Sequence, residues 1–135
     1  MSKSIVQEKA DAFAVRIVKA YKYITNQKHE YIMSKQLYRS GTSIQANIAE
    51  AQYAQSRKDF INKMSIALKE ANESRRWIGL LHKTSYLSDR EYTSIYHDVN
   101  EIVMILISII RKSKKNENKN NKDEESSSEM GGIEQ

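Results

Sequence analysis

The chain has no proline and only four glycines in 135 residues, and two of those glycines, Gly131 and Gly132, lie close to its C-terminal end. Sheets and tight turns depend on glycine and proline, because these residues supply the backbone conformations that reverse the chain. A chain with so few of them is expected to be all-α. The length and the 39% hydrophobic content fit one domain with one modest core.

Apolar residues recur at helical spacing in four segments, which predicts four amphipathic helices. The first covers about residues 6–24 and the second about residues 30–54. The third begins after Ser56 and the fourth after Ser88, because each serine stands three residues before an acidic residue, as in a helix N-terminal capping box. Helices of this length joined by short connections predict an up-down-up-down four-helix bundle.

The charge of the chain changes sign near residue 115. Residues 1–115 carry 20 Lys and Arg against 11 Asp and Glu, a net charge of +9, whereas residues 116–135 carry 2 against 6, a net charge of −4. The second segment has no apolar periodicity, so it cannot bury enough surface to offset the entropy of ordering. The sequence predicts a basic bundle over residues 1–115 and a disordered acidic and polar tail over residues 116–135.

The second predicted helix carries Gly41 and a row of small polar residues in its middle. A glycine inside a helix costs about 1 kcal/mol relative to alanine, so Gly41 is expected to mark a close contact with a neighbouring helix. Polar side chains also run along the edges of the buried faces of the second and third helices. They predict a partly buried polar network, with Arg39 or Arg75 as a partner, that contains Ser43, Asn47, Glu50, Glu70 and Glu73.

Carboxylates one turn apart also occur in the dinuclear metal sites of helical bundles, but those sites use Glu-x-x-His pairs, which this chain lacks. There is no cysteine to supply a disulfide or a thiolate ligand. No serine has a histidine at helical or turn spacing, and no glycine-rich loop is present to hold phosphates. We therefore predict no metal site, no cofactor and no enzymatic activity.

A family resemblance rests on two segments, RSGTSIQANIAEA at residues 39–51 and KMSIALKEANESRRWIGLL at residues 63–81. In order, spacing and helical position they resemble a bacterial four-helix-bundle family encoded in intervening sequences of 23S rRNA genes, often labelled S23 ribosomal protein. The resemblance covers roughly residues 13–111, and it implies a ring-like homopentamer without enzymatic activity. The family also includes accessory proteins of diversity-generating retroelements, which bind nucleic acid and a reverse transcriptase. Arg75 and Arg76 depart from the family pattern, in which an acidic or aromatic residue is expected.

The excess of basic residues has a physical use, because Lys and Arg that neutralise phosphates release condensed counterions without reading sequence. The residues expected to bind RNA or DNA are Arg16, Lys19, Lys22, Lys35, Arg39, Arg57, Lys58, Arg75, Arg76, Arg111 and Lys112. The acidic tail is expected to compete with phosphate. A charge run is often only a solvated face, so a protein-interaction scaffold with no nucleic-acid role is the alternative.

Five tyrosines in the first half of the chain are expected to pack at the edge of the core rather than stack on bases: Tyr21, Tyr23, Tyr31, Tyr38 and Tyr53. The fourth helix is apolar on nearly all sides around Ile105 and Ile107, which predicts contact with further copies of the chain, and the resemblance favours a pentamer. No apolar run reaches the ~20 residues of a membrane span, and no apolar signal segment is present. We expect a cytoplasmic protein with no membrane partner, whose partners are its own copies, RNA or DNA, and a reverse transcriptase.

Overall fold

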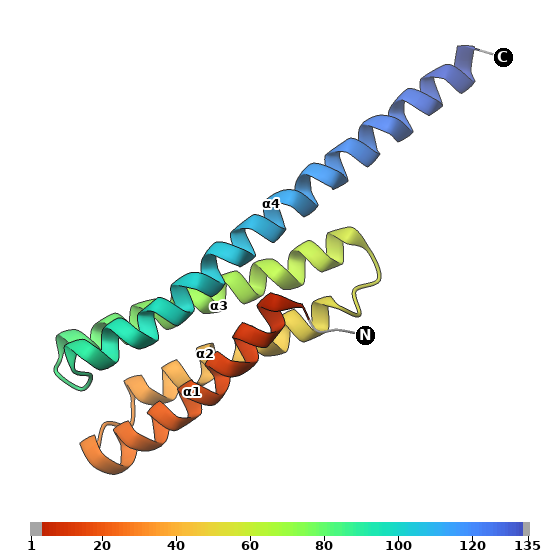
Figure 1. Cartoon of the computed structure of the whole chain (residues 1–135). Coiled ribbons are helices and arrows are strands. Elements are labelled where there is room, and N and C mark those ends of the chain that lie inside the picture. Colours follow the sequence, from red (N-terminus) through yellow and green to blue (C-terminus); the bar gives the residue numbers. More distant parts are fainter. Residues whose placement is uncertain (1–3, 134–135) are drawn as a thin grey trace.

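The computed structural model describes residues 4–133, with side chains described as far as Glu125. Four helices follow one another through short connections: α1 (Ile5–Lys28), α2 (Met33–Ala51), α3 (Arg57–Lys83) and α4 (Asp89–Ile133). They alternate in direction and form no strand within the described residues, so the predicted all-α bundle is confirmed (Figure 1). α2 packs on α1 and α3, and α3 packs on α4, whereas α1 and α4 meet more loosely.

Serine caps begin α3 and α4, as the sequence predicts. The Ser56 hydroxyl accepts a hydrogen bond from the Asp59 N–H at 3.0 Å, and the Ser88 hydroxyl accepts one from the Glu91 N–H at 3.1 Å. The Glu91 carboxylate accepts the Ser88 N–H in return at 2.8 Å. These bonds satisfy N–H groups that have no partner inside the helix, so both capping predictions are confirmed.

A carboxylate rather than a hydroxyl caps α2. Oε1 of Glu30 accepts hydrogen bonds from the N–H groups of Ile32 and Met33, and Oε2 accepts one from the N–H of Ser34, each at 2.8 Å. A negative group at this end of a helix also complements the helix dipole. Because Glu30 lies before the first turn rather than inside it, α2 begins three residues after the predicted start.

The four helices share one core of buried apolar side chains, which includes Phe13, Ile17, Ile24, Leu37, Ile44, Ile48, Ile78, Leu81, Ile102 and Leu106. Gly41 of α2 lies against Ile17 of α1. A Cβ atom at Gly41 would stand 2.9 Å from Cγ1 and 3.0 Å from Cγ2 of Ile17. The missing side chain therefore lets α1 approach α2, and the predicted close contact at Gly41 is confirmed.

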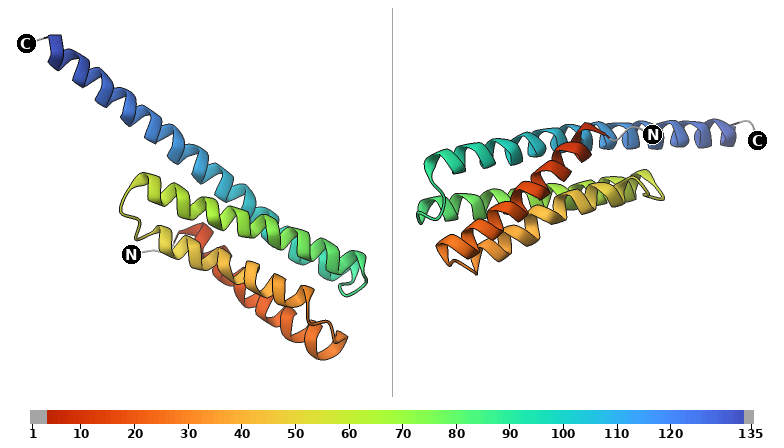
Figure 2. Two further views of the ribbon diagram at one scale, coloured as in Figure 1. Left: turned by 180° about the vertical axis from the view of Figure 1, so that it is seen from behind. Right: turned by 60° about the horizontal axis from the view of Figure 1, so that its bottom comes forward.

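Beyond the bundle, α4 continues alone as far as Ile133 (Figures 1 and 2). This differs from the disorder expected for residues 116–135, of which residues 134–135 lie outside the described part. The physical reason is that an existing helix grows by one backbone hydrogen bond per residue without a new nucleus, and residues 111–130 contain no proline or glycine. Helix formation here needs no burial of apolar surface. The division into bundle and tail at residue 115 stays a prediction.

The part of α4 from Asp89 to Glu125 is long and apolar enough to cross a membrane, by length and composition alone. The core helix of a soluble protein meets the same test. In this bundle α4 buries Val99, Ile102 and Leu106 among the other helices, and Asp98 forms an ion pair with Arg16 of α1. The expectation that no membrane partner exists stays a prediction.

Candidate nucleic-acid interface

Two of the predicted nucleic-acid-binding arginines contact other helices of the bundle. Nη1 of Arg16 lies 2.6 Å from Oδ2 of Asp98, and its Nη2 donates to the Ser94 hydroxyl at 2.6 Å, which ties α1 to α4. Arg75 donates to the side-chain carbonyl oxygens of Asn72 on its own helix and of Asn100 on α4, both at 2.8 Å. Each guanidinium group is thus held by polar partners before any ligand arrives.

Arg39 is the third predicted cation with a partner in the bundle. Its Nη2 lies 2.7 Å from Oε1 of Glu73 and its Nη1 lies 3.4 Å from Oε2 of Glu70, so it joins α2 to α3. The hydrogen bond from Arg39 lowers the pKa of Glu73 below its ordinary value, and the Trp77 indole N–H reinforces this by donating to the same Oε1 at 3.4 Å. Of the two partners that the sequence left open for these glutamates, the structure brings Arg39 to them.

The other members of the predicted polar network do not join this cluster. The Ser43 hydroxyl donates to the Arg39 carbonyl at 2.6 Å, and the Asn47 amide donates to the Ser43 carbonyl at 2.8 Å, so both bond to the backbone of their own helix. Glu50 pairs with Lys63 at 3.2 Å. The expected single network is therefore split, because side chains of Ser and Asn reach the carbonyl four residues earlier more easily than a neighbouring helix.

Sequence reasoning missed a buried polar contact between α2 and α3. The Ser74 hydroxyl donates to the Ser40 hydroxyl at 2.9 Å, and both serines are fully buried. Their inward position at helical spacing was the available signal, but spacing alone does not show that two hydroxyls on different helices meet.

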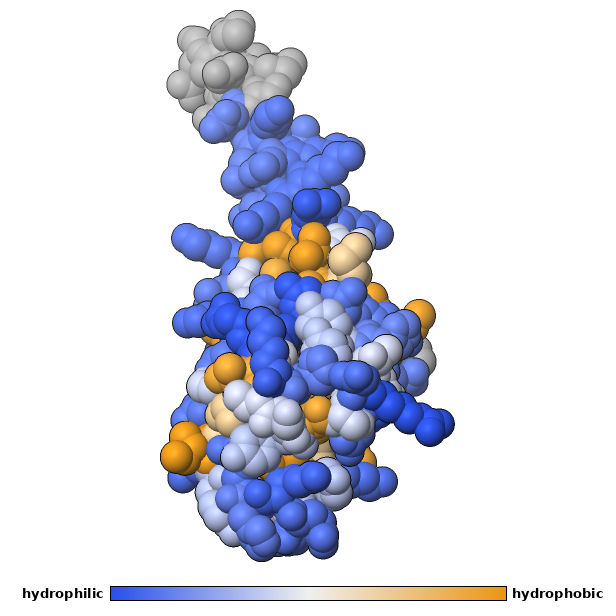
Figure 3. Space-filling view, turned by 90° about the vertical axis from the view of Figure 1, so that its left-hand side faces the viewer, coloured by the Kyte–Doolittle hydropathy of each residue, from blue (hydrophilic) through white to orange (hydrophobic). Residues whose placement is uncertain are grey.

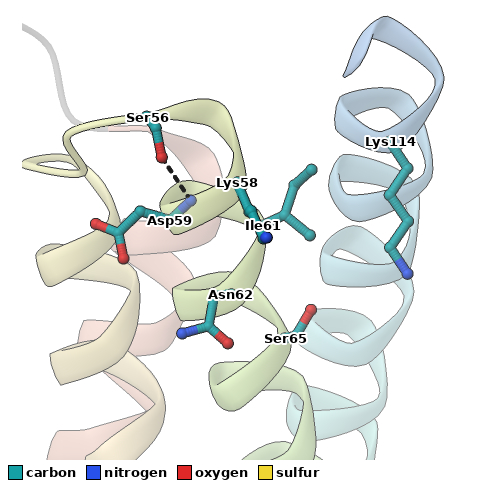
Figure 4. Close-up of a pocket in the computed structure, with 7 residues that line it drawn as sticks. All are labelled: Ser56, Lys58, Asp59, Ile61, Asn62, Ser65 and Lys114. Atoms are coloured by element: carbon teal, nitrogen blue, oxygen red, sulfur yellow. Dashed lines mark hydrogen bonds between the residues drawn. The ribbon is translucent and has the colours of Figure 1, made fainter. Parts of the chain in front are cut away.

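The remaining eight predicted cations form no ion pair with any residue that the structure describes: Lys19, Lys22, Lys35, Arg57, Lys58, Arg76, Arg111 and Lys112. One group lies where α4 leaves the bundle beside the start of α3. There Lys58 and Lys114 line a shallow hollow between the two helices (Figure 4), and Arg57 and Lys112 line a second one. Asp59 also lines the first hollow, and its carboxylate points away from Lys114 (Figure 4).

The second group lies on the hairpin of α1 and α2, and we call residues 12–49 the basic hairpin. It contains six Lys and Arg and a single carboxylate, that of Glu30. Glu30 is only 8% exposed. Burial raises its pKa, but the backbone hydrogen bonds from Ser34, Met33 and Ile32 outweigh burial and lower the pKa from its ordinary value. Arg16 and Arg39 are paired with carboxylates of the other two helices, and the basic hairpin presents its remaining four cations to solvent without an ion pair among the described residues: Lys19, Lys22, Lys28 and Lys35.

The tyrosine side chains are more exposed than the sequence predicts. Tyr31 is 59% exposed, Tyr38 41% and Tyr53 87%, and Tyr23 is exposed as well, so the prediction of core-edge packing is wrong for these four. Tyr21 is half-buried, with its ring centroid 5.0 Å from that of Tyr38. The reason is that the described residues place no helix over the outer side of α1 and α2 (Figure 2).

Apolar surface gathers at the base of the free part of α4 (Figure 3). Met104 is 62% exposed, whereas Ile105 and Ile107 are partly buried and pack against the rim of the core. These two isoleucines, which the sequence predicts to contact further copies of the chain, are therefore partly covered within one chain. Ile5 at the start of α1 is exposed too, and it lies one turn before Lys9, which pairs with Glu101 of α4.

Among the described residues, no group of three His, Asp or Glu side chains converges in a way that would hold a metal ion. The described polar side chains form helix caps, ion pairs and contacts between helices. Chemically, the arrangement offers positive charge and exposed aromatic rings.

Comparison with known proteins gives the family. The sequence profile of 23S rRNA-intervening sequence proteins matches residues 2–108. A similar crystal structure is that of a protein of unknown function from the S23 ribosomal protein family of Bacteroides thetaiotaomicron, which is 57% identical, with a TM-score of 0.78 over 78% of this chain and 98% of that one. No curated protein matches the chain. The family has no established function and is not a known enzyme family. This chain belongs to the family of 23S rRNA-intervening sequence proteins.

Proposed function

We propose that the protein is a non-catalytic, oligomeric helical-bundle protein that binds nucleic acid without sequence preference, as an accessory to RNA- or retroelement-related machinery. The observation that carries this proposal is the basic hairpin, whose single carboxylate is buried and holds the start of α2. The family name, which refers to sequences that interrupt 23S rRNA genes, supports an RNA-related setting.

Binding follows from the charge of this surface. Lys19, Lys22, Lys28 and Lys35 are exposed and make no ion pair with any described residue. Cations of this kind attract phosphates and displace their counterions, so affinity falls steeply as salt rises. Each copy in an oligomer adds another basic hairpin, and several weak sites on one nucleic acid strengthen one another.

The test is a salt series with generic RNA and DNA, measured by fluorescence anisotropy. We expect log K to fall linearly with log salt, with a slope of roughly −0.7 for each phosphate neutralised on a single strand. The double variant Lys22→Glu/Lys35→Glu should lose about tenfold or more in affinity at low salt. A matched control, Lys69→Glu/Arg90→Glu, makes the same change of charge on exposed residues of α3 and α4 and should lose much less.

Two further outcomes locate or reject the interface. Equal losses in both double variants would show that only the total charge matters. A larger loss in Arg57→Glu/Lys112→Glu would place the interface at the base of the free part of α4. If the wild-type protein binds neither RNA nor DNA at the lowest salt, the proposal is wrong.

The proposed oligomer is a pentamer held partly by α4. The supporting observation is the apolar surface formed by Met104, Ile105 and Ile107, because contiguous apolar surface on a soluble protein often marks an interface. Light scattering should give about five times the 15.7 kDa mass of one chain. Ile105→Lys/Ile107→Lys should lower the assembled mass while helicity is kept, and Leu80→Lys, on an exposed position of α3, is the control. A wild-type mass of one chain would reject the oligomer.

The same apolar surface favours a second candidate function, a protein-interaction scaffold whose positive charge has no ligand. Under this alternative, assembly persists while binding of nucleic acid is absent even at low salt. We also propose the cytoplasm as its location and a reverse transcriptase as a protein partner, and co-purification of such an enzyme with the tagged chain would test the partner.

A further inference from the structure

We infer that the outer face of the basic hairpin takes single-stranded nucleic acid, with unpaired bases stacked on Tyr31 and Tyr38 and the backbone held by Lys22 and Lys35. This inference rests on the proposed function and names the class of nucleic acid at that site. The inference is based on the two exposed tyrosine rings, whose exposure the positive charge of this surface does not explain.

The two rings are held in place and still open to solvent. Tyr38 contacts the half-buried Tyr21 of α1, with 5.0 Å between centroids and an interplanar angle of 50°, so its ring is supported from one side. The Tyr31 hydroxyl lies 3.2 Å from Nδ1 of His29, which restrains that ring beside the connection between α1 and α2. A ring that is fixed before binding loses little conformational entropy when a base stacks on it.

Positive charge lies next to these rings. Lys35 precedes Tyr38 by three residues on α2, and residues at this spacing are neighbours on a helix surface. Lys22 is on α1, the helix that carries Tyr21, and like Lys35 it is exposed and forms no ion pair with a described residue. Glu30 is the single carboxylate of this hairpin, and its two oxygens are directed to the N–H groups at the start of α2. A strand on this face would therefore meet rings for its bases and unpaired lysines for its phosphates.

This combination favours a single strand over a duplex. Stacking on an aromatic side chain requires a base with a free face, and bases in a duplex are already stacked on their neighbours. A duplex would contact only the lysines, so the tyrosines would add nothing to its binding. Stacking also needs no particular base, which agrees with binding that does not read sequence.

Tyrosine is common in protein interfaces as well, so a second copy of the chain is the competing occupant of this face. A two-fold contact through it would bring two basic hairpins together. The four lysines without an ion pair, Lys19, Lys22, Lys28 and Lys35, would then face their copies, and like charges across an interface are unfavourable. Charge complementarity therefore points to a polyanion.

The experiment measures anisotropy of the full chain with two probes, an oligouridylate of about 20 nucleotides and an RNA duplex of about 20 base pairs. Tyr31→Leu and Tyr38→Leu remove the stacking ring and keep apolar bulk. Each should weaken single-strand binding by about fivefold or more and leave duplex binding nearly unchanged. Tyr53→Leu is the matched control, because Tyr53 is exposed just beyond the far end of α2, and it should change neither affinity.

The outcomes separate this inference from the proposed function. If neither variant weakens single-strand binding, or if both weaken duplex binding equally, the inference is wrong while salt-dependent binding through the lysines still stands. If the wild-type chain binds neither probe, the proposed function itself fails. A fall in assembled mass with unchanged affinity would assign the face to a protein interface and overturn the inference. Tyr31→Leu alters a residue outside the helices, so it remains informative even if Tyr38→Leu disturbs the contact with Tyr21.

Discussion

The hairpin of α1 and α2 and the hairpin of α3 and α4 use their charges differently. Within the described residues, cations of the first hairpin pair with carboxylates of the second: Lys9 with Glu101, Arg16 with Asp98, and Arg39 with Glu70 and Glu73. The reverse arrangement occurs between Glu50 and Lys63. The second hairpin therefore supplies most of the negative charge that holds the two together.

A cation that lies at the contact between the two hairpins is paired with a carboxylate, whereas a cation that lies away from this contact remains available to bind a ligand. Arg16 and Arg39 lie at the contact and are paired, whereas Lys19, Lys22 and Lys35 face away and have no ion pair among the described residues. A count of basic residues cannot make this distinction. Changes to the glycines, to Glu30, to Arg39 and to the free part of α4 should affect stability in decreasing order.

The largest effect is expected from Gly41 and Gly79, one in each hairpin. Gly41→Leu should destabilise the fold by about 1–3 kcal/mol, because the side chain must displace Ile17. Gly41→Ala should also lose stability, since its Cβ would stand 2.9 Å from Ile17 Cγ1. A Cβ at Gly79 meets no atom within 4 Å, so Gly79→Ala should stabilise by up to about 1 kcal/mol. Urea unfolding would measure all three, and a more stable Gly41→Ala would contradict the close contact.

A smaller effect is expected from the one carboxylate of the basic hairpin. The folded chain lowers the pKa of Glu30 below its ordinary value of 4.5, so its ionised form stabilises the fold above about pH 4.5. That stabilisation is lost as the pH falls through the lowered pKa. Glu30→Gln should cost about 1–2 kcal/mol at pH 7, and the two curves of stability against pH should converge in acid. Glu8→Gln, on an exposed position of α1, should change little, and a constant difference at all pH values would reject the role of the charge.

The ion pairs between the hairpins should contribute less. Arg39 is half exposed, so Arg39→Gln should cost only about 0.5 kcal/mol at low ionic strength. The cost should shrink at about 1 M salt, where the Debye length is about 3 Å. Arg76→Gln serves as the control, because Arg76 is an exposed residue of α3. A cost that does not depend on salt would show that packing of the side chain, rather than charge, accounts for it.

Removal of the chain after Lys115 should have the smallest effect on stability, since the far part of α4 extends away from the bundle (Figures 1 and 2). The sequence alone predicts stronger nucleic-acid binding, because a charge of −4 is removed. The helical path of α4 changes this expectation. Asp123 lies nine residues beyond Lys114, or about 14 Å along the axis. This distance exceeds the Debye length of about 8 Å at physiological salt, so the charge of Asp123 is largely screened there. Affinity should therefore change less than about twofold at about 0.15 M salt. A larger gain would show that the segment unwinds and folds back onto the bundle.

Local signals predicted much of the fold. The caps at Ser56 and Ser88 depend on contacts three residues apart, and Gly41 needed a packing reason because a glycine is costly in the middle of a helix. The start of α2 was missed because the Glu30 cap depends on the path of the connection before it. There His29 adopts the left-handed backbone conformation, with φ of 55°, which the sequence does not indicate.

The candidate site was harder to predict, because it depends on how the helices are rotated about their axes. Periodicity shows that Glu70 and Glu73 lie at the edge of a buried face, but it does not show whether Arg39 or Arg75 stands opposite them. The exposure of the tyrosine side chains was hard to predict for the same reason. Tyr38 directly follows the inward residue Leu37, and only the arrangement of the helices shows that one side of its ring contacts Tyr21 while the other is exposed.

The continuity of α4 fixes the direction of its free part relative to the bundle. A single helix runs from the buried core through its free part, so an element joined to its end would be placed by residue count alone. Each inserted residue advances that element by about 1.5 Å and turns it by about 100°. An insertion of seven residues nearly restores its direction about 10.5 Å farther out, whereas an insertion of two would turn it almost to the opposite side. Reach and orientation can thus be changed there without a single substitution in the bundle.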